Sequence, residues 1–276
     1  METIHSDWGR WLPDAVADAE PDGVDLWYLG CNGFVLKAAE GTTIFIDPYL
    51  GTGDPPRTVR MIPVPFAPED IVDADAVLAT HEHTDHVHGP SQAPILEATG
   101  ATFYGASASI DIARQWTDDV DIDSHQIKHI SPGDRFDVGP FSITVEPAHD
   151  PDAVDPVSYV VEHETGTFFH GGDARPSEDF SSIGDRYDID LGVVAFGSDG
   201  MLLDKETREP THTTWYADEN EAAAAARQLQ LDRLVPTHWD MWKGLTADPG
   251  SLWNHVRTYD HPRTLEIAEI GDRLSM

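Results

Sequence analysis

The chain has 276 residues, of which 40% are apolar, enough for one large layered domain with a hydrophobic core. The 50 acidic residues outnumber the 17 basic ones and give a formal net charge of -33, spread along the chain without an acidic tail. This balance argues against nucleic-acid binding, which needs Lys and Arg beside phosphates, and it favours a cytoplasmic protein adapted to high salt over a protein that binds cations or a basic partner.

The predicted elements begin with a short helix near residues 8–12 that docks on the domain. Apolar and alternating stretches then predict strands at 26–29, 34–38, 43–47, 76–80, 125–130, 141–146, 157–162, 167–170, 191–196, 233–237 and 264–270. Helices are expected near 94–98, at 109–116 and at 218–231. Strand-rich segments therefore alternate with helices in two successive halves.

Two long loops and one helix start carry clear local signals. The Gly- and Pro-rich segment 50–68 predicts a loop at the rim of an active site, and 197–216 predicts a second long loop. The helix at 218–231 is expected to begin with Asp218 as its N-cap, and Glu221 three residues later completes a capping box.

Cys31 is the only cysteine, which excludes a disulfide framework and a cysteine metal cluster. Its neighbours Gly30 and Gly33 favour a small buried filler, although a reactive thiol stays possible. No apolar run is long enough to predict a membrane span, and the acidic N-terminus lacks a signal-peptide pattern. We expect a small-molecule substrate, and the sequence leaves a homo-oligomer open.

The most informative motif is the run His81-Glu82-His83-Thr84-Asp85-His86, which follows the apolar stretch 76–79. Imidazole and carboxylate are the groups that hold Zn²⁺ and similar divalent ions. His81 and His83 are two apart and leave an extended segment on one face, whereas Asp85 and His86 need a turn toward a second set of ligands. A solvated polar loop is the weaker interpretation, because clustered imidazoles do nothing for a soluble surface. The motif therefore predicts one loop that serves two metal ions.

A two-ion site needs further ligands from other strand ends. Three residues stand just beyond predicted apolar strands: His149 after 141–146, Asp173 after 167–170, and His238 after 233–237. Sites on layered α/β scaffolds collect at such positions.

These residues, in this order, resemble the metallo-β-lactamase superfamily over nearly the whole chain. The resemblance implies a single α/β domain over residues 1–276, folded as an αββα sandwich with two metal ions at one edge between the sheets. It also implies a ligand set in which His81, His83 and His149 hold the first ion, Asp85, His86 and His238 hold the second, and Asp173 bridges the two.

Within the superfamily, the segments 26–33, 47–53, 170–173 and 236–242 look like the L-ascorbate-6-phosphate lactonase (UlaG-like) branch. This implies a hydrolase that uses one or two Zn²⁺ or Mn²⁺ ions and opens a lactone or similar small cyclic ester by attack of a metal-bound hydroxide. Asp85 would be both a ligand and a catalytic proton acceptor. The segment between His149 and Val157 is shorter than in that branch, and the basic residues for a sugar phosphate have no clear match.

Two enzyme alternatives stay open on the same fold: a phosphodiesterase or nuclease, and an iron-dependent oxidoreductase. A non-catalytic binding protein is a third, disfavoured by the complete ligand set. We expect Lys243, five residues beyond His238, and His212, in the second long loop, to contact the substrate. Arg57, Arg60 and Arg175 are further candidates for contact with an anion.

Overall fold

The computed structural model describes residues 2–197, 199–204 and 206–276. A first sheet contains β1 (Val24–Gly30), β2 (Gly33–Ala38), β3 (Thr43–Ile46), β4 (Ala76–Leu78), β5 (Thr102–Gly105), β6 (Ile127–His129) and β16 (Arg273–Ser275). Its strand order is β16-β1-β2-β3-β4-β5-β6. From β3 to β6 the neighbouring strands run parallel, so their carboxyl ends meet at one edge.

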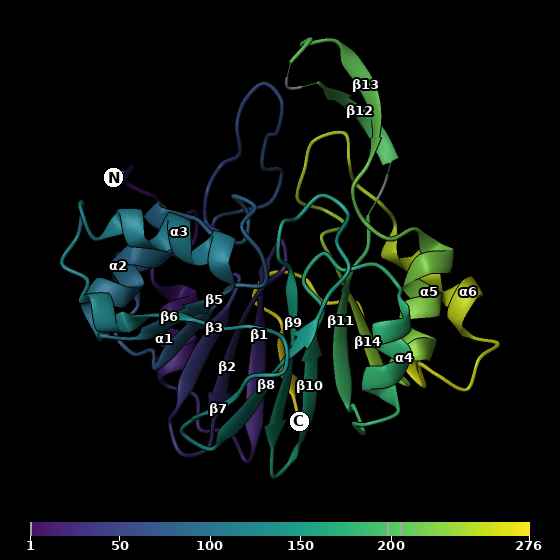
Figure 1. Cartoon of the computed structure of the whole chain (residues 1–276), viewed down its shortest axis with the longest axis horizontal. Coiled ribbons are helices and arrows are strands. Elements are labelled where there is room, and N and C mark those ends of the chain that lie inside the picture. The colour runs from purple at the N-terminus through teal and green to yellow at the C-terminus, as the bar shows by residue number, and fades with distance from the viewer. Residues whose placement is uncertain (1, 198, 205) are drawn as a thin grey trace.

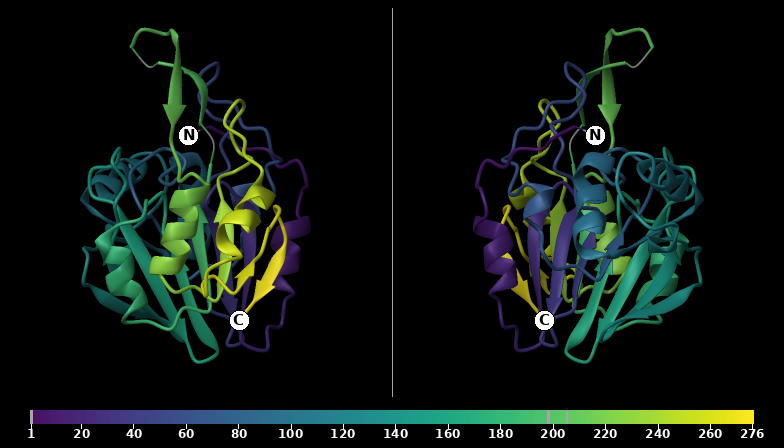
Figure 2. Two further views of the ribbon diagram at one scale, coloured as in Figure 1. Left: turned by 90° about the vertical axis from the view of Figure 1, so that its right-hand side faces the viewer. Right: turned by 90° about the vertical axis from the view of Figure 1, so that its left-hand side faces the viewer.

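The second sheet contains β7 (Arg135–Val138), β8 (Phe141–Pro147), β9 (Val157–His163), β10 (Gly166–His170), β11 (Leu191–Ala195), β14 (Arg233–Thr237) and β15 (Thr264–Leu265). Its order is β15-β14-β11-β10-β9-β8-β7, with parallel pairing from β10 to β15. Two further strands, β12 (Asp199–Leu203) and β13 (Pro210–Thr214), form a hairpin that projects beyond the sheets, as Figure 2 shows in both views.

Helices cover the outer faces of both sheets (Figure 1). On the first sheet lie α1 (Trp11–Ala17), α2 (Gly89–Thr99) and α3 (Ser107–Trp116), and on the second lie α4 (Glu178–Gly184), α5 (Glu219–Gln228) and α6 (Trp253–Val256). Single 3₁₀ turns occur at Pro68–Asp70, Ser124–Gln126 and Pro249–Leu252. Within the described part of the chain, no helix is long and apolar enough to cross a membrane.

The core has three layers, as an αββα sandwich requires. The central layer lies between the sheets and includes Leu26, Phe34, Ile143 and Phe168, all fully buried. Separate apolar clusters lie under the helices on each side. Both faces of β1 are covered, which explains its continuous apolar sequence instead of an alternating one. The predicted fold class is confirmed.

Several local predictions need correction. The predicted loop 197–216 contains the β12–β13 hairpin, and the strand expected at 264–270 is only the two residues of β15. The first sheet is closed instead by β16, which pairs with β1 through Leu26 and Leu274. β16 has a single buried apolar residue, so its sequence alone carries no strand signal. The capping box at the start of α5 is confirmed, because Asp218 accepts from the Glu221 amide and Glu221 from the Asp218 amide.

Candidate metal centre

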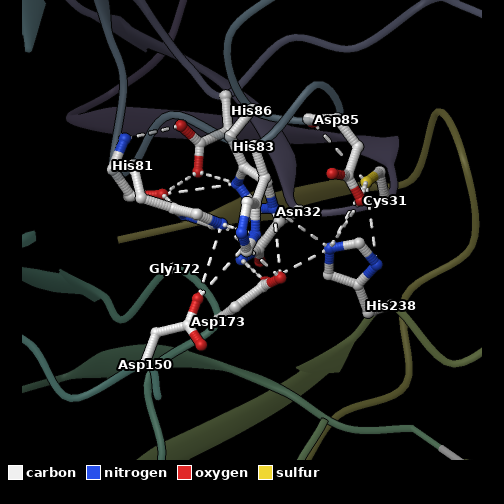
Figure 3. A network of polar contacts seen from close by, with 12 residues as sticks. Cys31, Asn32, His81, His83, Asp85, His86, Asp150, Gly172, Asp173 and His238 are labelled. Carbon is white, nitrogen blue, oxygen red and sulfur yellow. Dashed lines mark hydrogen bonds and ion pairs between the residues drawn. The ribbon is translucent and has the colours of Figure 1, made fainter. Parts of the chain in front are cut away.

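The candidate ligands meet at the edge where the parallel strands of both sheets end (Figure 3). Residues 81–86 follow β4 in the first sheet, Asp173 follows β10 in the second, and His238 comes directly after β14. Parallel pairing within each sheet, and the packing of one sheet on the other, bring side chains more than 150 positions apart into hydrogen-bond range. Sheet topology therefore assembles this site.

A first group of ligand atoms comes from His81, His83 and Asp150. His81 Nε2 lies 2.9 Å from His83 Nδ1 and 3.7 Å from Asp150 Oδ2, and His83 Nδ1 lies 3.9 Å from the same oxygen. Nitrogen and oxygen ligands about 2.0–2.2 Å from a tetrahedral ion lie roughly 3.3–3.5 Å from one another. The three distances scatter on both sides of these values, so the side chains converge on one point without holding the ideal spacing of a tetrahedral ion.

The structure does not bring His149 into this group. β8 ends at Pro147, so the alternation of the strand stops before His149, which is exposed. The next side chain, Asp150, turns inward and is only 7% exposed. Burial, together with the Asp173 carboxylate, raises the pKa of Asp150, as expected for a carboxyl group placed where a cation would offset its charge. The third residue that converges with His81 and His83 is thus Asp150, whereas His149, the ligand expected from the resemblance, points outward.

A second group comes from Cys31, Asp85, His86 and His238. His238 Nε2 lies 3.4 Å from His86 Nε2, 3.9 Å from Asp85 Oδ2 and 3.3 Å from Cys31 Sγ. Asp85 is 18% exposed, whereas both histidines are fully buried. The imidazole nitrogens of His86 and His238 and the carboxylate oxygen of Asp85 converge, as the resemblance implied. The Cys31 sulfur beside them was not expected from the sequence.

Asp173 lies between the two groups. Its Oδ2 is 3.2 Å from His86 Nε2 and 3.9 Å from His81 Nε2, and its Oδ1 is 3.2 Å from His238 Nε2. Burial alone would raise the pKa of this carboxyl, but the His86 and His238 imidazoles outweigh it and hold the pKa well below its usual range. Both oxygens thus contact the second group, through His86 and His238, and Oδ2 also approaches His81 of the first, which is the position that a bridging carboxylate needs.

Asp47 orients His86 from behind. It follows β3, and its Oδ2 lies 2.7 Å from His86 Nδ1. Thr80 fixes the carboxylate through its amide, 2.8 Å from Oδ1, and its hydroxyl, 2.6 Å from Oδ2. With Nδ1 paired in this way, Nε2 of His86 is the nitrogen that faces the centre. From the sequence, Asp47 belongs to the segment 47–53 without an assigned role, and a carboxylate directly after a strand is the signal that could have found it.

The loop after β1 is tied to the His238 loop. Cys31 and His238 both have positive φ angles, 59° and 65°, which non-glycine residues rarely adopt. The Cys31 carbonyl accepts from the His238 amide at 2.9 Å and from the Tyr28 hydroxyl at 2.8 Å. Asn32 accepts from Thr237 through its Oδ1 at 2.8 Å. These bonds hold both strained residues in place, as is common at functional sites.

A cavity of about 1010 Å³ opens onto the centre, and His83, Asp85, Asp150 and Asp173 form part of its wall. Its aromatic wall consists of Tyr49, Trp215, Tyr216 and Trp242. The predicted rim segment 50–68 contributes to it, and the β12–β13 hairpin adds residues such as Leu203. His88 also lines the cavity, and burial lowers its pKa to about 4.

The two predicted substrate contacts do not lie on this wall. On β13, Thr211 and Thr213 line the cavity, so His212 between them faces the other way. The Lys243 side chain is exposed and lies outside the lining residues, because its segment pairs through its amide with the Val59 carbonyl and directs the side chain outward.

Arg57, a further anion-contact candidate from the sequence, does line the cavity. Its guanidinium lies 5.0 Å from the centre of the Trp215 ring, and its buried Nε has no hydrogen-bond partner. Arg60 instead bonds carbonyls of its own loop, including those of Ile62 and Tyr49, so its role is to shape the rim.

The Beta-lactamase superfamily domain model matches residues 42–239, well over half of the chain. The chain belongs to the metallo-β-lactamase superfamily. The match includes all the ligand candidates except Cys31. Metallo-β-lactamase folds imply divalent metal ions, and the converging imidazole and carboxylate groups fit such ions.

Three known proteins illustrate the range of similarity. A probable L-ascorbate-6-phosphate lactonase UlaG of Escherichia fergusonii is 25% identical over 292 residues, which cover 89% of this chain and 78% of that protein. Igni18, a metallo hydrolase from Ignicoccus hospitalis, superposes with a TM-score of 0.67 at 20% identity over 91% of this chain and 97% of its own. CmlA, a diiron beta-hydroxylase from Streptomyces venezuelae, has a TM-score of 0.66 at 15% identity over 93% of this chain and 55% of its own, which shows a shared fold alone.

Proposed function

We propose that this metal-dependent hydrolase opens a lactone or similar small cyclic ester. The observation that carries the proposal is the pair of ligand groups joined by Asp173 and exposed to one deep cavity. The similarity to proteins named as probable lactonases supports a carbonyl substrate. Membership of the superfamily supports hydrolysis, and the choice of an ester as the substrate is our proposal.

The side chains divide the work between holding ions and handling protons. Divalent ions in these groups would supply an acidified water and a Lewis acid for an ester carbonyl. His81, His83 and Asp150 would hold one ion and His86 and His238 the other, with Asp173 shared. Asp85 reaches the cavity surface and is the carboxylate placed to accept a proton from water. The aromatic wall would exclude solvent from the ester ring.

The charges of the cavity favour a small substrate over a polyanion. Acidic residues of the wall beyond the ligand groups are Glu2, Asp54, Glu82, Asp152, Asp204 and Glu206. Among the described lining residues, Arg57 is the one Lys or Arg. A nucleic-acid strand needs a series of phosphate contacts, which a single guanidinium does not provide. A compact ester carrying at most one anionic group fits this wall.

The test compares kcat/KM on a panel of lactones with that on single-stranded RNA and DNA, using metal-loaded protein at matched high salt. We expect lactones to be cleaved faster, and Asp173→Ala, purified in parallel, to be inactive because it removes the shared ligand. Faster cleavage of nucleic acid would overturn the ester proposal and favour the nuclease alternative. Failure to cleave any lactone with two ions bound would also overturn it.

A further inference from the structure

We propose that the Cys31 thiolate is a ligand of the second ion, which makes that half of the centre a mixed sulfur, nitrogen and oxygen site. The inference rests on the metal centre and not on the ester substrate. Cys31 Sγ lies 3.3 Å from His238 Nε2 and 3.8 Å from Asp85 Oδ2. Together with His86, these atoms all lie within 4.8 Å of one another.

The spacing is compatible with a sulfur ligand. A sulfur about 2.3 Å from a tetrahedral ion lies roughly 3.6 Å from nitrogen or oxygen ligands at about 2.0–2.2 Å. The distances from Cys31 to His238 and Asp85 fall on either side of this value. The 3.4 Å between His238 Nε2 and His86 Nε2 likewise fits the roughly 3.3 Å expected for two nitrogens on one ion.

The backbone aims the sulfur at this point. Cys31 is fully buried and adopts a φ of 59°, held by the two hydrogen bonds that its carbonyl accepts from Tyr28 and His238. A side chain that only fills space needs no such strain. The polar atoms nearest the sulfur are the His238 ring nitrogens, at 3.3 and 3.6 Å, and Asp85 Oδ2, at 3.8 Å. Figure 3 shows Cys31 and Asp85 on the same side of the His238 ring.

A thiolate ligand changes which metal the site prefers. Soft sulfur ligands favour Zn²⁺ and related transition metals, whereas Mn²⁺ and Mg²⁺ favour oxygen ligands. On binding, the thiol proton leaves to solvent and the sulfur lone pair bonds to the ion. The first group has two imidazoles and a carboxylate but no sulfur, so it lacks the preference for Zn²⁺ that a thiolate adds. The two halves of the centre should therefore differ in selectivity, with Zn²⁺ preferred over Mn²⁺ beside Cys31.

The test uses the full-length wild-type protein titrated with Co²⁺ and followed by absorption spectroscopy. A thiolate ligand produces a sulfur-to-cobalt charge-transfer band in the near ultraviolet. Because Cys31 is the only cysteine, such a band has one possible source. We expect the band in the wild type, and its absence at saturating Co²⁺ would overturn the proposal without any variant.

Two variants sharpen the result. Cys31→Ser should lose the band and bind Zn²⁺ at least about 10-fold more weakly, with Mn²⁺ binding little changed. Asp150→Asn is the matched control, because it weakens the first group and should keep the band. A band that survives Cys31→Ser, or equal loss of Zn²⁺ and Mn²⁺ affinity in that variant, would contradict thiolate ligation. Lactone hydrolysis is measured in a separate assay. The absorption band does not depend on the substrate, so failure of the ester proposal would not affect this test.

Discussion

Asp47 Oδ2 lies 2.7 Å from His86 Nδ1, and both side chains are completely buried. This contact joins a residue at the end of β3 to one in the loop after the neighbouring parallel strand β4. It fixes the ring of His86 and raises the basicity of the nitrogen that faces the metal centre. The pairing of β3 with β4 is therefore part of the metal site.

The Asp47–His86 contact gives the first prediction. Asp47→Asn should weaken binding of the second ion about 10- to 100-fold, because the amide no longer provides a charged acceptor for Nδ1. Isothermal titration with Zn²⁺ measures the effect. Asp75→Asn is the control, since Asp75 also accepts a backbone amide, from Thr43, but at the opposite end of β3. Equal affinity in the two variants would mean that Asp47 acts only on folding, which melts of the metal-free proteins also report.

The neighbouring residues His149 and Asp150 give a second, paired prediction. Asp150→Ala should reduce the metal content by about one equivalent and lower hydrolysis sharply, because the first group keeps only its two imidazoles. His149→Ala should change neither quantity, because that side chain is exposed. Elemental analysis of both purified variants measures metal content. Loss of metal in His149→Ala alone would restore the ligand set expected from the sequence.

A third prediction concerns substrate contact. Arg57→Ala should raise KM about 10-fold for lactones that carry an anionic group and leave neutral lactones unaffected, since one charge-assisted hydrogen bond is lost. Lys243→Ala should affect neither class, because Lys243 is exposed and lies off the cavity wall. Steady-state kinetics on matched anionic and neutral esters distinguish the two residues. The opposite pattern would return the contact to Lys243.

The fourth prediction concerns salt. The net charge of -33 destabilises the folded chain by self-repulsion in dilute buffer. The Debye length falls to about 3 Å at molar salt, so the melting temperature should rise by roughly 5 °C or more between dilute buffer and molar KCl. Thermal melts with chelator and with metal, across one salt series, separate screening from ion binding. A melting temperature that does not change with salt would refute adaptation to high salt and favour a basic partner.

Most of the candidate metal loop could be predicted from residue order alone. His81, His83, Asp85 and His86 are contiguous, so their role needs only a short strand and a turn. Asp173 and His238 were also predictable, because each follows an apolar strand and the carboxyl ends of parallel strands converge. The same local periodicity indicated the alternation of strands and helices. A ligand motif made of neighbouring residues can be predicted from the sequence, because its geometry depends on the local backbone alone.

The other residues of the candidate site could be found only from the way the chain packs. That Asp150 and not His149 turns inward depends on the path of the chain after β8, where strand alternation no longer applies. Asp47 and Cys31 reach the site through pairing of β3 with β4 and through the backbone contact between Cys31 and His238. No ligand pattern marks either residue in the sequence. Their roles come from side chains distant in sequence packing against one another, and linear spacing does not encode such contacts.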